Sequence, residues 1–212
     1  MIVNEIFYSI QGESSFMGRP CAFIRLTGCN LRCAWCDSRY SFDEGTEMAV
    51  ADIVRTVGRY PAALALVTGG EPMLQPAVHE LLAALLEREY TVLLETGGHM
   101  PLEKVDRRVR KIVDFKCPSS GMEGHNDYDN VLCLTRDDEV KFVIGDRPDF
   151  DWACERVRSL GLVSRVGEIL FSPVAGRISF ADLADRVLQA GIPARLQLQL
   201  HKIIWPGRER GV

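Results

Sequence analysis

The 212-residue chain has no long hydrophobic run, no block of like charge and no low-complexity tract. No apolar stretch approaches the roughly 20 residues that a membrane-spanning helix needs, and Met1–Glu5 lacks the pattern of a secretory signal. Lys and Arg number 25 against 29 Asp and Glu, with the two signs interspersed. Nucleic acids and anionic membranes are bound by clustered positive charge, so neither is an expected partner. We expect a cytoplasmic protein.

The composition is that of an ordinary globular protein, with 47% hydrophobic and 25% charged residues. A chain of this length buries roughly 70% of its unfolded surface, so it needs no disulfides to hold a core. Neither an internal repeat nor a linker interrupts the sequence. We expect one domain over residues 1–212.

Short apolar runs alternate with segments of helical periodicity, which predicts parallel βα units with right-handed crossovers. There are too few units for the eight repeats of a closed barrel, which typically take about 250 residues. We therefore expect an α/β fold: a partial, open TIM-like barrel of about six parallel strands, with fewer helices than a full barrel. The predicted strands are Val3–Ile10, Cys21–Thr27, Ala62–Thr68, Thr91–Glu95, Lys111–Phe115, Glu139–Ile144, Glu168–Phe171 and Ala194–Leu200. The predicted helices are Met48–Gly58, with Thr46 as its N-cap, Pro76–Glu89, Phe150–Leu160 and Phe180–Gln189.

Seven cysteines are present, an odd number that disfavours a disulfide framework. Four are scattered and are expected to be small buried side chains. The other three, Cys29, Cys33 and Cys36, follow a predicted strand with the spacing C-x3-C-x2-C. Three nearby thiolates can hold a four-iron cluster while leaving one iron free for a substrate or cofactor. The alternative is a zinc site completed by a distant Cys or His, although no second ligand pair is present.

The cysteine spacing, with Trp35 directly before the third cysteine, resembles the motif of the radical SAM superfamily. Thr68-Gly69-Gly70-Glu71-Pro72 resembles its GGEP motif, whose glycines let the backbone approach a ligand closely. The resemblance implies a barrel of the radical SAM type and a [4Fe-4S] cluster on the three cysteines. It also implies S-adenosylmethionine at the free iron, cleaved to methionine and a 5′-deoxyadenosyl radical.

Three further segments resemble the 7-carboxy-7-deazaguanine synthase family of queuosine and 7-deazapurine biosynthesis: Phe7–Glu13, Arg25 and Arg195–Lys202. The resemblance implies a lyase that contracts 6-carboxy-5,6,7,8-tetrahydropterin to 7-carboxy-7-deazaguanine and releases ammonia, with Mg2+ assisting. It further implies a homodimer and an external low-potential reductant such as flavodoxin. A protein-activating radical SAM enzyme and a non-enzymatic zinc-binding domain stay open as alternatives.

Candidate site residues follow from the same resemblance and from strand alternation. The substrate contacts are expected at Ile10, Gln11, Gly12, Arg25, Thr68 and His201. The S-adenosylmethionine contacts are expected at Trp35, Cys36, Asp37, Gly70, Ser119, Ser172, Pro173 and Val174. Ser38 stands where the family has a Thr that ligates Mg2+, and it keeps the oxygen donor that this metal prefers.

Alternation puts Arg25 on the inner face of its strand, where a buried guanidinium needs an anionic partner. That partner is either the substrate carboxylate or a neighbouring glutamate such as Glu13. Alternation in the last strand places Arg195, Gln197, Gln199 and His201 on one face. The remaining histidines, His79, His99 and His125, are expected to have ordinary surface roles.

Overall fold

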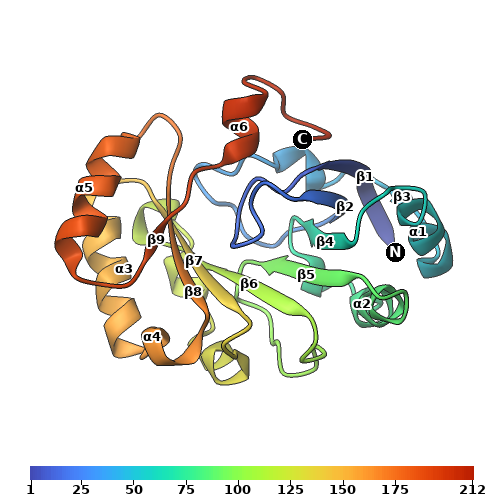
Figure 1. The fold of residues 1–212 in the computed structure, drawn as a ribbon, viewed down its shortest axis with the longest axis horizontal. Helices are drawn as coiled ribbons and strands as arrows, with labels where there is room; N and C mark the ends of the chain where they lie inside the picture. The colour runs from blue at the N-terminus through green and yellow to red at the C-terminus, as the bar shows by residue number, and fades with distance from the viewer.

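The computed structural model describes all 212 residues and contains one nine-stranded sheet that curls around a central space (Figure 1). The strand order is β3-β1-β2-β4-β5-β6-β7-β8-β9. In this spatial order, neighbouring strands from β2 through β4 to β9 are parallel, whereas β1 is antiparallel to both of its neighbours, β2 and β3. The end strands β3 and β9 do not pair, so the barrel is open, as predicted. The strands are β1 (Ile2–Ile10), β2 (Pro20–Leu26), β3 (Thr46–Glu47), β4 (Leu64–Gly69), β5 (Thr91–Thr96), β6 (Arg110–Phe115), β7 (Glu139–Ile144), β8 (Glu168–Pro173) and β9 (Arg195–Leu196).

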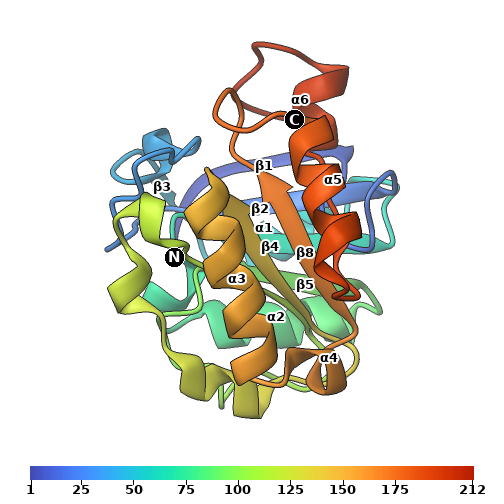
Figure 2. The ribbon, with the colours of Figure 1, turned by 90° about the vertical axis from the view of Figure 1, so that its left-hand side faces the viewer.

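Helices cover the outer face of the sheet, with α3 and α5 beside β8 and with α6 at the end near the C-terminus (Figure 2). No α-helix follows β5 or β6, so there are fewer helices than in a full barrel, as expected. None of the helices combines the length and apolarity that crossing a membrane requires. The helices are α1 (Val50–Val57), α2 (Val78–Glu87), α3 (Arg147–Ser159), α4 (Leu162–Arg165), α5 (Phe180–Ala190) and α6 (Leu200–Ile204).

The inner face of the sheet has an apolar layer below a polar layer. The apolar layer is a cluster of six buried side chains: Cys21, Phe23, Leu64, Leu66, Leu93 and Ile112. Alternate residues of a strand share a face, so the residues two positions after Phe23, Leu66, Leu93 and Ile112 lie above them. These are Arg25, Thr68, Glu95 and Asp114, and Lys141 of β7 is paired with Asp114 in register. The polar layer thus stands at the carboxyl ends of the parallel strands, where barrel enzymes carry their sites.

Two predicted elements are wrong in detail. Ala194–Leu200 was expected to be a strand, but only Arg195–Leu196 pairs with β8, and α6 begins at Leu200. The strand ends because the side chains of Gln197 and Gln199 turn inward to the carboxylate of Glu13. Thr46 is not a helix N-cap. It belongs to β3, where its backbone pairs with Val3 of β1, and Ala49 precedes α1 instead.

Candidate active site

A cavity of about 890 Å³ opens at the carboxyl ends of the strands, beneath α6 and the C-terminal segment. Its lining brings together residues from the whole length of the chain. The predicted residues that line it are Ile10, Gln11, Gly12, Arg25, Cys29, Cys33, Trp35, Cys36, Asp37, Ser38, Thr68, Gly70, Val174 and His201. Ser119, Ser172 and Pro173 are not part of the lining.

The loop that follows β2 carries the three clustered cysteines, all free and all partly exposed. Backbone hydrogen bonds fix the loop, including Gly28 N–H to Ser41 O at 2.8 Å and Ala34 N–H to Ser120 O at 3.0 Å. The backbone N–H of Leu31 also donates to Cys29 Sγ at 3.4 Å, an arrangement that stabilises a thiolate. No three His, Cys, Asp or Glu side chains lie close enough together to hold a single metal ion.

The surroundings of Cys29 and Cys33 on balance favour the neutral thiol. Burial raises the pKa of both Cys29 and Cys33, while the nearby ammonium of Lys116 acts in the opposite direction. Lys116 is itself paired with Asp114 at 2.9 Å, so much of its charge is already compensated. Metal ligation requires thiolates, and the iron of a cluster would supply the positive charge that holds them deprotonated.

The glycine motif packs directly against the cysteine loop. A Cβ atom on Gly70 would lie 2.3 Å from Gly28 O and 2.7 Å from Cys29 Cβ, so only glycine fits there. The N–H of Glu71 donates to Gly28 O at 2.8 Å, which joins the two motifs. The Glu71 carboxylate is buried and accepts from Thr96 Oγ1 and from the backbone N–H of Gly97. This cavity-lining residue therefore holds the loop after β5 through its carboxylate.

His99 also connects the glycine motif to the cysteine loop. It does not have the surface role expected for it, because its side chain is only 4% exposed. Its Nε2 lies 2.6 Å from Asn30 Oδ1 in the cysteine loop, and its Nδ1 lies 3.6 Å from Glu71 Oε2 without a hydrogen bond. Burial lowers the pKa of His99 to about 4. The ring is therefore neutral near pH 7, and Nε2–H is assigned as the donor to Asn30.

Arg25 lies on the inner face of β2, as predicted, but its carboxylate partner is Glu5 rather than Glu13. Its Nε donates to Glu5 Oε1 at 2.9 Å, and the two residues are register partners of the β1–β2 pair. No other hydrogen bond within the chain engages the guanidinium. The terminal nitrogens of this cavity-lining residue thus remain free for a ligand.

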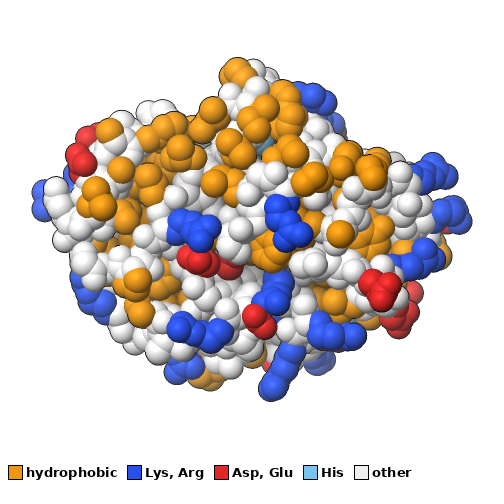
Figure 3. All heavy atoms as spheres, in the orientation of Figure 1, with side chains coloured by type: hydrophobic (Ala, Val, Ile, Leu, Met, Phe, Trp, Pro, Cys, Tyr) orange, Lys and Arg blue, Asp and Glu red, His pale blue; other side chains and the backbone are white.

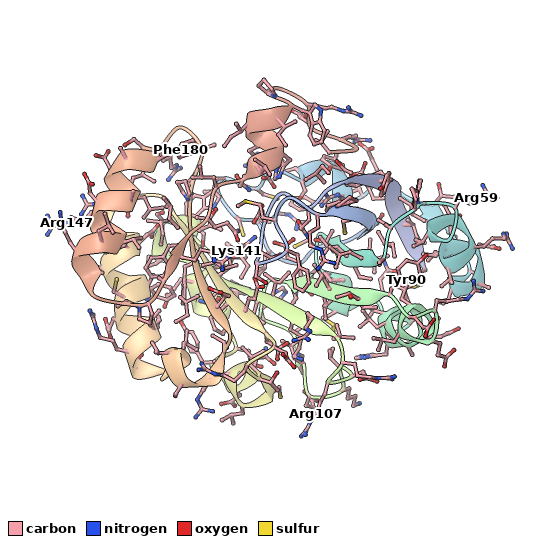
Figure 4. The ribbon with its side chains drawn as sticks, viewed as in Figure 1. Arg59, Tyr90, Arg107, Lys141, Arg147 and Phe180 are labelled. Carbon is pink, nitrogen blue, oxygen red and sulfur yellow. The ribbon has the colours of Figure 1, made fainter.

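Lys141 lies near the centre of the barrel (Figure 4), and its ammonium joins three carboxylates. Its Nζ is 2.9 Å from Glu13 Oε2 and 3.6 Å from Asp114 Oδ2, and it also pairs with Glu95. Burial alone would lower the pKa of Lys141, but the carboxylates outweigh it and raise that pKa well above its ordinary value. Glu13 also accepts from Gln197 and Gln199, which connects the first loop to the last segment.

Sequence reasoning did not assign Glu95, Asp114 and Lys141 to the site. The signal was present in β7, because Lys141 interrupts a strand that is otherwise apolar between Val140 and Ile144. A charged residue in a strand buried on both faces must find a partner inside the protein.

His201 meets the first loop, although it belongs to α6 and not to a strand. The N–H of Leu200 donates to Gly12 O at 3.0 Å, and a Cβ on Gly12 would lie 2.3 Å from His201 Nδ1. Burial lowers the pKa of His201, with Glu13 acting in the opposite direction. Lys202 of the same helix pairs with Asp37 at 2.7 Å, so α6 closes onto the cysteine loop.

The residues expected near S-adenosylmethionine differ in their availability. The guanidinium of Arg177 lies 5.0 Å from the ring centre of Trp35. Ser119 donates through its backbone and hydroxyl to the buried carboxylate of Asp149. Ser172 Oγ, by contrast, is buried without any hydrogen-bond partner, two residues before Val174, which follows β8 and lines the cavity.

The open barrel, the cysteine loop and the glycine motif together define a radical SAM protein, and the model of the radical SAM superfamily matches residues 23–187. The 7-carboxy-7-deazaguanine synthase of Chlorobaculum tepidum is 45% identical over 99% of this chain and 96% of its own length. That of Koribacter versatilis is 43% identical over the full length of both. The chain belongs to the 7-carboxy-7-deazaguanine synthase family.

Solved structures share the same fold. The crystal structure of QueE from Escherichia coli matches with a TM-score of 0.78 at 24% identity, covering 94% of both chains. Streptococcus suis SuiB, bound to its precursor peptide SuiA, matches with a TM-score of 0.63 at 11% identity. This second match covers 83% of this chain and 47% of SuiB, so it shows a shared fold within a longer protein.

Proposed function

We propose that the chain converts 6-carboxy-5,6,7,8-tetrahydropterin to 7-carboxy-7-deazaguanine and ammonia; its relatives are named for this product. The observation that carries this proposal is one cavity lined both by the cysteine loop and by the polar layer of the inner sheet face. The polar layer includes Arg25, whose terminal nitrogens are free, and so it offers a carboxylate-binding group near a radical-generating site.

The residues fit the [4Fe-4S] cluster and S-adenosylmethionine that the family implies. Cys29, Cys33 and Cys36 would hold the cluster, and Gly70 and Val174 line the same cavity, where the nucleotide would bind. The unpartnered hydroxyl of Ser172 is a further available contact. When bound, the cluster supplies the electron that cleaves S-adenosylmethionine reductively.

The chain's own side chains would bind and orient the pterin. Arg25 can hold its carboxylate in bidentate geometry through the two terminal nitrogens. His201, kept neutral near pH 7 by burial, can accept or donate a hydrogen bond from the opposite wall beside Gly12. Gln11 is nearly fully buried, and its Oε1 accepts from Glu13 N–H at 3.2 Å, which fixes the amide at the cavity edge.

A magnesium ion at Ser38 is part of the proposal. The hydroxyl lines the cavity two residues beyond Cys36, with Oγ 3.8 Å from Cys36 Sγ. Ser38→Thr should keep stimulation by Mg2+, because a hydroxyl remains, and Ser38→Ala should lose it. Equal stimulation of the alanine variant would remove Ser38 as the ligand.

We also propose a homodimer, a flavodoxin-like electron donor and a cytoplasmic setting. Ile203 and Ile204 on α6 are half-exposed, hydrophobic side chains gather over the α6 end of the molecule in Figure 3, and two-fold homodimers are the commonest oligomers. Arg32 and Arg39 are exposed on the cysteine loop, where an acidic donor would approach. All seven cysteines are free, which suits a reducing compartment.

The deciding experiment is anaerobic reconstitution with iron, sulfide, reductant, S-adenosylmethionine, Mg2+ and the carboxytetrahydropterin. We expect 7-carboxy-7-deazaguanine by mass spectrometry together with an equal amount of ammonia. Cleavage of S-adenosylmethionine without either product would reject the lyase and favour a protein-activating enzyme. Zinc in place of iron and sulfide in anaerobically purified protein would reject the radical chemistry altogether.

A further inference from the structure

One carboxylate, that of Glu5 on β1, connects the proposed substrate anchor to the C-terminal end of the chain. Its Oε1 accepts from Arg25 Nε at 2.9 Å and from the Tyr40 hydroxyl at 3.0 Å. Its Oε2 accepts from the backbone N–H of Gly211 at 3.2 Å. The Glu5 side chain is only 17% exposed, so these donors replace the water that a carboxylate otherwise binds.

The C-terminal segment, residues 206–212, is held over the cavity by Glu5, Tyr40 and Glu44. Pro206, Gly207, Arg208, Glu209 and Val212 are lining residues. The guanidinium of Arg210 lies 4.2 Å from the ring centre of Tyr40 and pairs with Glu44 at 2.7 Å. Burial raises the pKa of Tyr40 to about 12, so its hydroxyl keeps the proton that it donates to Glu5.

We propose that Glu5 is a positioning residue: it fixes the guanidinium of Arg25 for the substrate carboxylate and, through its other oxygen, holds the C-terminal segment over the occupied cavity. The role in substrate binding rests on the proposed function, whereas the hold on the segment does not.

The geometry explains why one residue serves both purposes. A guanidinium can meet one carboxylate at Nε and a second at its two terminal nitrogens. Arg25 cannot turn away from Glu5 without leaving a largely buried carboxylate uncompensated, so Glu5 limits the guanidinium to one orientation. Because Gly211 N–H and Arg25 Nε share this carboxylate, disturbing Glu5 disturbs the anchor and the cover together.

Glu5→Gln is the first test, because the amide keeps the shape but loses the charge. We expect the KM for the carboxytetrahydropterin to rise roughly tenfold or more, as when a buried hydrogen bond to a charged group is lost. The Ki of tetrahydropterin without the carboxylate, used as a competitive inhibitor, should be unchanged. Arg25→Gln should show the same selective loss with a larger rise in KM, because the substrate carboxylate then loses its charged partner altogether.

Glu44→Gln is the matched control, since Glu44 pairs with exposed Arg210 and does not contact Arg25. Its KM should stay near the wild-type value, because exposed ion pairs contribute little. If the wild type is active and Glu5→Gln has the same KM as the wild type, the proposal is overturned. If the wild type forms no product, the proposed function is rejected. The second test then decides whether Glu5 holds the C-terminal segment.

Limited trypsin digestion of the protein, with or without its cofactors, is that second test. In Glu5→Gln, cleavage after Arg208 and Arg210 should become several-fold faster than in the wild type. Arg107 and Arg108 are exposed in a distant loop, so cleavage there should be unchanged and serves as the internal reference. Unchanged cleavage at the C-terminal sites, or faster cleavage at both places from general loss of stability, would overturn the proposal.

Discussion

At the scale of single residues, the cysteine loop depends on a missing side chain as well as on its thiols. Gly70→Ala would place a methyl group 2.3 Å from Gly28 O, against backbone that cannot move without shifting Cys29. Overpacking of this kind costs roughly 1–3 kcal/mol. We expect less iron and sulfide per chain after anaerobic reconstitution. Gly124→Ala is the control, because its Cβ would meet no atom within 4 Å.

Loss of a thiol from the cysteine loop and loss of a thiol elsewhere should affect cluster assembly differently. Cys33→Ala should abolish cluster assembly, because two thiolates do not replace the three that hold the cluster. Cys133→Ala, a partly exposed cysteine outside the cavity lining, should assemble normally. Iron and sulfide analysis with the visible absorbance of the cluster compares the two, and a Cys33→Ala protein that still cleaves S-adenosylmethionine would contradict the assignment.

At the scale of elements, hydrophobic patterning predicted the strands from Val3 to Phe171 to within a few residues, because all of them except the half-exposed β1 are mostly buried. It was wrong at Ala194–Leu200, where Gln197 and Gln199 alternate with leucines as in a strand. Their alternation reflects hydrogen bonds to Glu13 and not a sheet face. The local pattern cannot show this, because the partner lies at the other end of the chain.

Lys141 shows what a buried charge does within a strand. Lys141→Met should lower the free energy of unfolding by roughly 3–5 kcal/mol, because it leaves Glu13 and its neighbours uncompensated. Urea unfolding measures the difference, with exposed Lys104→Met as the control. Lys141→Arg should recover part of the loss. Equal stability of the Met and wild-type proteins would mean that the carboxylates do not depend on this cation.

At the scale of the whole molecule, the cavity is assembled from segments that the sequence alone could place only through the family resemblance. The cysteine and glycine motifs predicted a shared ligand, and the structure adds that they touch at Gly28 and Gly70. The pairing of Arg25 with Glu5 required the antiparallel register of β1 and β2, whereas the expected partner, Glu13, is taken by Lys141. The charge of Arg25 predicted a carboxylate partner but could not show which carboxylate that partner is.

The pH dependence of folding tests the neutral state of His99, which links β5 to the cysteine loop. Its pKa falls from 6.5 to about 4 on folding because of burial. Between these values the unfolded chain binds more protons than the folded one, so stability is full above about pH 6.5 and is lost as the pH falls towards 4. The contribution of this one group is roughly 2 kcal/mol between pH 8 and pH 5.

Urea unfolding of wild type and His99→Gln at those two pH values isolates that contribution. Glutamine keeps an N–H donor for Asn30 but does not titrate, so the variant should lose less stability than the wild type on acidification. The carboxylates titrate in both proteins and cancel in the difference. His79→Gln, a change on α2 outside the cavity, should retain the part of the slope that His99 supplies. If His99→Gln and the wild type lose the same free energy, the pKa of His99 does not fall on folding, and the ring is protonated at pH 5 in the folded protein.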